Sequence, residues 1–149
     1  MSIYEKSYTL GPVYKWRLEQ YVSPWPNQRT AIEDWRKRLE PVAKSDFDTF
    51  LKNMAKRAEW HYPDIDGLRG KKYRGLSELR WISGNVQHRV IGYTLSDHHY
   101  LMLIGCTHKQ RRYTPTSCLD SAAERRKRVE RGEACYSEYP LITDRGTSR

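Results

Sequence analysis

The stretch LSELRWISGNVQHRVIGYTLSDHHYLMLIGCT, residues 76–107, contains three runs of strand-forming residues separated by two short links. In the first run, Glu78 and Arg80 alternate with Leu79 and Trp81, which is the period-two pattern of a strand with one buried face. The last run, YLMLIGCT, is the most apolar of the three, as expected for a central strand. The links SGN and SDHH are too short for a parallel crossover, so we predict three antiparallel strands.

Further elements are expected on both sides of these strands. A strand is predicted over residues 14–22, and the prolines of the following SPWPN segment end it. Two helices come next: one begins at Thr30 and is ended or kinked by Pro41, and the other begins at Ser45 and has one apolar face. A third helix follows the strands and ends before Gly132, a residue type common just after helix C-termini.

This order of elements, β-α-α-β-β-β-α, predicts one α+β domain over residues 1–132. We expect its helices to cover one side of a small antiparallel sheet. Residues 133–149 have no hydrophobic period and are expected to form a peripheral tail. A length of 149 residues and a hydrophobic fraction of 38% fit a single soluble domain.

The formal net charge of +9 favours a nucleic acid, an anionic membrane or an acidic protein as a partner. No run approaches the roughly 20 apolar residues that a membrane span needs, and no membrane partner is expected. The opening segment MSIYEKSYTL lacks the apolar core of a signal peptide. We therefore expect a cytoplasmic location.

The positive charge is concentrated in one part of the chain. Residues 67–112 contain nine basic and two acidic side chains, which leaves +7 of the total of +9. The aromatic residues Tyr73, Trp81, Tyr93 and Tyr113 are interleaved with this charge. Basic groups neutralise phosphates and aromatic faces stack on unpaired bases, so the pattern favours single-stranded RNA. The alternative is a basic surface with core aromatics scattered through it.

The three cysteines have no CxxC spacing, and their odd number argues against a disulfide framework. A zinc site built from Cys106, His108, Cys118 and Cys135 matches no common ligand spacing. Buried or surface thiols are the preferred interpretation, and no metal or cofactor is expected.

Three motifs together resemble the RelE/HigB superfamily of bacterial toxin–antitoxin systems, in particular its phage-derived, HigB-like branch. They are YRGLSELRW (73–81), HRVIGY (88–93) and YLMLIGCTHKQRRYTPTSCLDSAAERR (100–126). The resemblance implies a RelE-like domain with a small curved antiparallel sheet, two N-terminal helices and a C-terminal helix. It also implies a type II toxin that cleaves mRNA, often on the ribosome. An antitoxin encoded nearby, with a helix-turn-helix fold, would silence it.

RNA cleavage without a metal needs a base for the 2′-OH, cations for the phosphorane and an acid for the leaving oxygen. Arg80 and Arg89 come from adjacent strands and could grip one phosphate, and Arg89 lies where the resemblance places the catalytic arginine. His108 is the natural group for proton transfer. The catalytic candidates are Glu78, Arg80, Arg89, His108, Lys109 and Tyr113. The RNA-binding candidates are Lys71, Lys72, Tyr73, Arg74, Arg111 and Arg112.

Several of these residues have a structural alternative. Arg80 could pair with Glu78 along the sheet, His108 could be an exposed strand end, and Tyr113 could pack against the following helix. Two other functions also remain open: a non-catalytic inhibitor of DNA gyrase, like the ParE toxins, and a nucleic-acid-binding module without chemistry.

Overall fold

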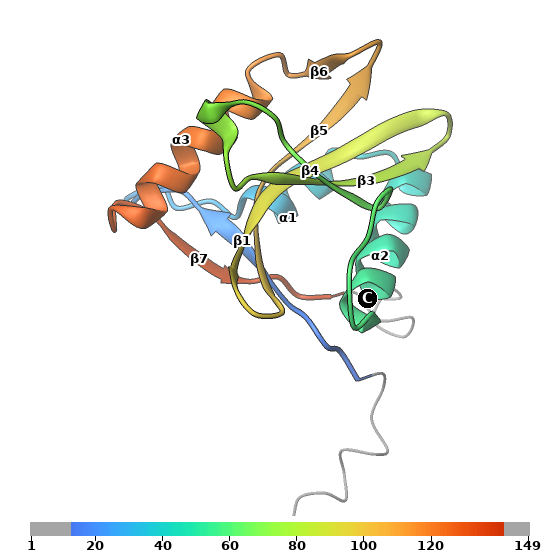
Figure 1. Ribbon diagram of the computed structural model, residues 1–149, viewed down its shortest axis with the longest axis horizontal. Coiled ribbons are helices and arrows are strands. Elements are labelled where there is room, and N and C mark those ends of the chain that lie inside the picture. Colours follow the sequence, from blue (N-terminus) through green and yellow to red (C-terminus); the bar gives the residue numbers. More distant parts are fainter. Residues whose placement is uncertain (1–12, 142–149) are drawn as a thin grey trace, which may run out of the picture.

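The computed structural model describes residues 13–141, which form an α+β fold with three α-helices and an open, mixed sheet (Figure 1). The helices are α1 (Ala31–Lys37), α2 (Pro41–Lys56) and α3 (Cys118–Glu130), together with a short 3₁₀ helix, η2 (Lys71–Tyr73). The strands are β1 (Arg17–Val22), β2 (Ile65–Gly67), β3 (Ser77–Ser83), β4 (Val86–Ser96), β5 (His99–Lys109), β6 (Arg112–Thr114) and β7 (Cys135–Glu138). None of these helices is long and apolar enough to cross a lipid bilayer.

The three strands predicted from residues 76–107 are confirmed as β3, β4 and β5, which pair antiparallel in this order. The complete order is β2-β3-β4-β5-β1-β7, with β6 paired to β5. The expectation of a wholly antiparallel sheet is corrected at one pair, because β1 runs parallel to β5. Parallel neighbours need a long connection, which two helices and three strands provide here.

Helices cover both faces of the sheet, which corrects the expectation of helices on one side (Figure 1). On one face, Phe47 of α2 stacks on Trp81 of β3, with their ring centroids 5.0 Å apart. On the other face, Ala122 of α3 belongs to a buried cluster with Ile91 and Cys106. The alternation of β3 therefore sends Leu79 and Trp81 toward α2, and leaves Glu78 and Arg80 on the face that α3 shares.

Helix α1 starts after Thr30, as predicted, but its capping contact and the start of α2 differ from the sequence prediction. Thr30 precedes α1, but its side chain makes no capping hydrogen bond. Gln20 of β1 caps the helix instead, because its Oε1 accepts hydrogen bonds from the backbone N–H groups of Ile32 and Glu33 at 3.1 and 2.9 Å. Pro41 begins α2 rather than ending α1, since proline is well tolerated at the first position of a helix.

The segment after Gly132 belongs to the fold as far as the structure describes it. Gly132 itself follows α3 with a φ of 75°, as predicted for a helix end. Strand β7 pairs antiparallel with β1, and Tyr139 is only 3% exposed in the core beside α2. All four residues of β7 are exposed, so the sequence lacks the hydrophobic alternation from which this strand could have been predicted. The rest of the expected tail, residues 142–149, lies outside the described part.

Close packing at Gly105 of β5 leads to a stability prediction. A Cβ atom at this position would lie 2.2 Å from Cδ2 of Trp35, whose indole lies directly on the strand. Gly105→Ala is therefore expected to reduce the free energy of unfolding by about 2–3 kcal/mol, because the indole has to shift. Urea unfolding followed by circular dichroism measures this change. Gly67→Ala is the control, since nothing lies within 4 Å of its Cβ position; equal loss in both variants would contradict the prediction.

Candidate functional site

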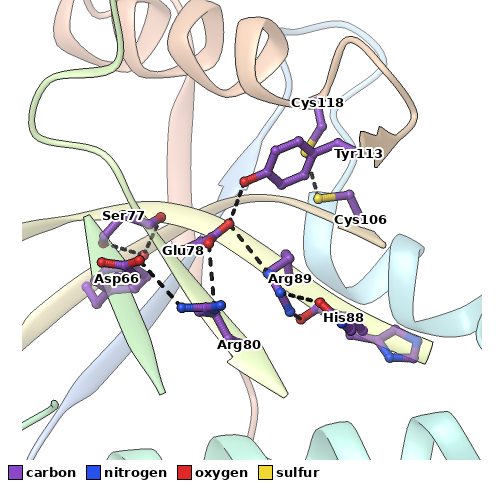
Figure 2. A network of polar contacts seen from close by, with 11 residues as sticks. Asp66, Ser77, Glu78, Arg80, His88, Arg89, Cys106, Tyr113 and Cys118 are labelled. Atoms are coloured by element: carbon purple, nitrogen blue, oxygen red, sulfur yellow. Dashed lines mark hydrogen bonds and ion pairs between the residues drawn. The ribbon is translucent and has the colours of Figure 1, made fainter. Parts of the chain in front are cut away.

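The pairing of β3 with β4 places two arginines side by side. Arg80 lies opposite Arg89 in the register of the two strands. Glu78 stands two residues before Arg80 and therefore projects from the same face of the sheet. The next strand, β5, places Cys106 opposite Arg89 on that face. Figure 2 shows the catalytic candidates Glu78, Arg80, Arg89 and Tyr113 in this part of the sheet.

The carboxylate of Glu78 lies at the centre of this group, as Figure 2 shows. Its Oε1 accepts a hydrogen bond of 2.7 Å from the hydroxyl of Tyr113 and lies 3.7 Å from Nε of Arg89. Its Oε2 lies 3.7 Å from Nε of Arg80. Glu78 is 8% exposed. One buried carboxylate therefore holds two guanidinium groups and a phenol together, and we call these four residues the Glu78 cluster.

Arg89 is the more deeply buried of the two arginines in the Glu78 cluster and is only 3% exposed. Its Nη1 donates to the backbone oxygen of His88 at 2.9 Å, and its Nη2 donates to Oε1 of Gln87 at 2.7 Å. Its buried Nε has no hydrogen-bond partner among the described residues. Burial lowers the pKa of Arg89, whereas the nearby Glu78 carboxylate opposes this shift. The arginine is thus fixed in place with one donor unused.

Arg80 lies closer to solvent than Arg89. Its Nη1 lies 3.4 Å from Oδ2 of Asp66, and its guanidinium carbon lies 5.4 Å from the ring centroid of Tyr62. Together with the 3.7 Å contact to Glu78, these interactions hold the side chain on three sides. The structural alternative for Arg80, a pair with Glu78, is therefore present as a long ion pair. The same arrangement leaves a quarter of the Arg80 side chain accessible.

His108 and Tyr113 face each other across the β5–β6 hairpin. They are opposite each other in the strand register, and their ring centroids are 4.7 Å apart. Burial, and then the positive charge of Arg89, lower the pKa of His108, so the imidazole is neutral at pH 7. Burial and the hydrogen bond to Glu78 raise the pKa of Tyr113, so the phenol keeps its proton. A proton acceptor and a proton donor therefore lie side by side.

The other basic candidates fall into two groups. Lys109 and Arg112 pair across the hairpin, and Arg111 lies in the turn between them with a φ of 67°. These three exposed side chains form the hairpin tip beside His108. The second group belongs to or follows η2 and lies against α3: it comprises Lys71, Lys72, Tyr73 and Arg74.

The η2 group has its own partners. The Tyr73 hydroxyl donates a 2.5 Å hydrogen bond to Asp120, and Nζ of Lys72 lies 2.9 Å from the same carboxylate. The hydrogen bond from Tyr73, and then that from Lys72, lower the pKa of Asp120, and the contact with Asp120 raises the pKa of Lys72. Among residues 13–141, no hydrogen bond or ion pair joins this group to the Glu78 cluster. It is therefore a separate basic segment.

The structure adds residues that the sequence prediction missed. An opening of about 350 Å³ lies beside the Glu78 cluster, and Arg80 and Arg89 line it together with Pro63, Asp64, Trp81, Ile82 and Gln87. Ile82 is 67% exposed at this opening, and Tyr62 is 70% exposed next to Pro63. Gln87 stands two residues before Arg89 and shares its face, so strand alternation could have found it. The contact between Tyr62 and Arg80 could not be predicted, because no sequence pattern in the loop around Tyr62 indicates it.

The three cysteines do not come together in the zinc site considered in the sequence analysis. Within the described ranges, no three His, Cys, Asp or Glu side chains gather as metal ligands would. Cys106 and Cys118 meet each other, whereas Cys135 lies exposed in β7. Comparison with known proteins assigns no family: no family model, no curated protein and no solved structure matches the chain.

Proposed function

We propose that this chain is the toxin of a type II toxin–antitoxin system, similar to the RelE/HigB superfamily, and that it cleaves mRNA without a metal ion. One observation carries this proposal: the Glu78 cluster gathers two arginines and a protonated tyrosine next to a neutral histidine, His108. Together these groups offer a base, cations and an acid, the three functions that the cleavage requires. The resemblance of the motifs at 73–81, 88–93 and 100–126 supports the same activity.

In this mechanism the scissile phosphate binds at the opening that Arg80 and Arg89 line. One phosphate oxygen supplies the acceptor that Nε of Arg89 lacks, and Arg80 binds another. His108 takes the proton from the ribose 2′-OH, and the resulting oxyanion attacks phosphorus. The bond to the 5′-oxygen breaks, Tyr113 protonates the leaving oxygen, and a 2′,3′-cyclic phosphate remains. Lys109 and the rest of the hairpin tip contact the phosphates that follow.

The opening beside Arg80 has the properties of a site for the neighbouring base. Its volume exceeds that of a nucleobase, and the exposed Ile82 and Tyr62 provide apolar surface at its rim. Gln87 accepts a hydrogen bond from Arg89 through Oε1, which leaves its amide N–H groups for a base edge. We expect the η2 group to bind RNA farther from the cut.

The direct test is primer extension on a defined mRNA incubated with the purified protein, with and without ribosomes. Discrete cuts by the wild type that disappear with His108→Ala would support an endoribonuclease. The comparison with and without ribosomes shows whether the ribosome is required. Absence of cuts in both conditions would overturn the proposal.

The cleavage rate is expected to depend on pH through His108. A general base works only when it is deprotonated, and the pKa of His108 is lowered by burial and by Arg89. The rate should therefore be constant near pH 7 and fall in acid, with a midpoint below pH 6.5, the ordinary value for histidine. Single-turnover rates between about pH 5 and 8 test this expectation. A midpoint above 6.5 would assign the acid limb to another group.

The burial of Arg89 favours a second candidate function. Both of its terminal nitrogens are already bonded inside the protein, and Glu78 and Asp66 neutralise the two arginines. An internal ion-pair network of this kind would suit a non-catalytic inhibitor of DNA gyrase, like the ParE toxins, or a plain nucleic-acid-binding module. Growth arrest on expression without RNA cuts would favour the gyrase inhibitor.

The partners follow from the proposed activity and from the charge. We propose that the toxin acts in the cytoplasm on mRNA and the ribosome. A nearby antitoxin with a helix-turn-helix fold would cover the basic region, residues 67–112, with an acidic segment. A short neighbouring reading frame with that character would support this pairing.

A further inference from the structure

Two buried thiols meet behind the Glu78 cluster. Sγ of Cys118 lies 2.8 Å from Sγ of Cys106, within hydrogen-bonding distance. Both side chains are at most 1% exposed. Cys106 lies in β5 opposite Arg89, and Cys118 is the first residue of α3 (Figure 2). The pair therefore joins the central strand of the site to the helix that covers it.

We propose that Cys106 and Cys118 form a reversible intramolecular disulfide when the protein meets a peroxide. A disulfide bond is about 2.05 Å long, so the sulfurs have to approach by less than about 1 Å from their present positions. The two residues are twelve positions apart in sequence, and the chain between them forms the β5–β6 hairpin. The fold already supplies the proximity that a disulfide requires.

The reaction balances with hydrogen peroxide as the oxidant. One cysteine sulfur attacks a peroxide oxygen, the O–O bond breaks, and a sulfenic acid and one water form. The second thiol then attacks that sulfur, the S–O bond breaks, and a second water leaves as the S–S bond forms. Two thiols and one peroxide thus become a disulfide and two waters. A small-molecule thiol reverses the reaction by exchange.

The surroundings of the thiols set the pace of these steps. The hydrogen-bonding contact with Cys118, and then burial, raise the pKa of Cys106, so its thiol stays protonated at pH 7. The thiolate is the reactive form of cysteine, and both side chains are buried. Oxidation therefore takes place when the β5–β6 hairpin moves briefly away from α3 and exposes the sulfurs to peroxide.

The disulfide would also regulate the site, a consequence that rests on the proposed RNA cleavage. His108 and Tyr113 both lie on the segment between the two cysteines. With this segment closed into a covalent loop, Tyr113 is held against Glu78. In the proposed mechanism the Tyr113 hydroxyl has to turn from Glu78 to the leaving oxygen, and the covalent loop hinders this movement. The oxidised protein is therefore the less active form.

The first experiment measures the bond itself. Cys135→Ser removes the exposed cysteine, and this variant is treated with peroxide, denatured, alkylated with N-ethylmaleimide and weighed by mass spectrometry. We expect a mass lower by two hydrogen atoms and no added maleimide. We also expect the melting temperature to rise by about 5 °C. The matched control is Cys106→Ala in the same background, which keeps one thiol. Two alkylated thiols, or only oxygen adducts, would overturn the proposal.

The second experiment measures RNA cleavage by the same variant before oxidation, after oxidation and after reduction. Cleavage is expected to fall about tenfold on oxidation and to return with a thiol reductant. Unchanged cleavage by a protein shown to contain the disulfide would overturn the regulatory role. If the reduced protein cuts no RNA, the proposed function fails, and the mass measurement still decides whether the disulfide forms.

Discussion

Replacing His108 with alanine is expected to slow RNA cleavage about 10²–10⁴-fold and to change RNA affinity by less than about threefold. The imidazole is neutral at pH 7 because burial and Arg89 lower its pKa, so it contributes proton transfer rather than charge. The side chain makes no hydrogen bond with other described residues, and its loss should leave the fold intact. Single-turnover cleavage and filter binding to a 2′-deoxy-substituted RNA measure the two quantities separately.

A histidine outside the site provides the control. His61 is exposed in the loop that leads to β2, so His61→Ala should cleave at the wild-type rate. Wild-type cleavage by His108→Ala would remove His108 from the chemistry. Equal loss of binding and cleavage would point instead to a plain RNA-binding role.

The central strands and the positions of three site residues could be predicted because both depend on short-range patterns. Alternation along β3 fixes which side chains share a face, and this places Glu78 beside Arg80. The two-residue turn after β3 then fixes the register of β4, which brings Arg89 opposite Arg80. The glycine at position 132 also correctly predicted where the third helix ends.

The rest depends on contacts between residues far apart in the chain. The cap on α1 comes from Gln20 in another element, and Tyr113 reaches Glu78 across 35 residues. The parallel pairing of β1 with β5 has no local signature either. Arg89 is buried because α3 and the neighbouring strands pack around it. The residues next to it in the sequence do not reveal this packing, and arginines are mostly exposed, so its burial could not be predicted.

The ion pair between Glu78 and Arg89 leads to the largest expected change in stability. Glu78→Leu leaves Arg89 buried without its counter-charge, and we expect the free energy of unfolding to fall by about 3–5 kcal/mol. The double variant Glu78→Leu/Arg89→Met removes both charges and should recover most of this loss. Urea unfolding of the wild type, both single variants and the double variant gives the coupling energy between the two side chains.

A surface pair shows what an ordinary ion pair contributes. Arg29 and Asp34 lie 2.9 Å apart, closer than Glu78 and Arg89, but Arg29 is largely exposed. We expect a coupling energy below about 1 kcal/mol for this pair, because solvent screens it. If Glu78→Leu alone costs no more than that, the carboxylate does not hold the buried arginine.

The double variant also separates stability from chemistry, which neither single variant can do. A protein that is folded and as stable as the wild type, yet cuts no RNA, would show that the ion pair serves the reaction. A stable double variant with full RNA cleavage would show that Arg89 is structural. In that case the phosphate site would have to be sought at Arg80 and the hairpin tip, where basic side chains remain accessible.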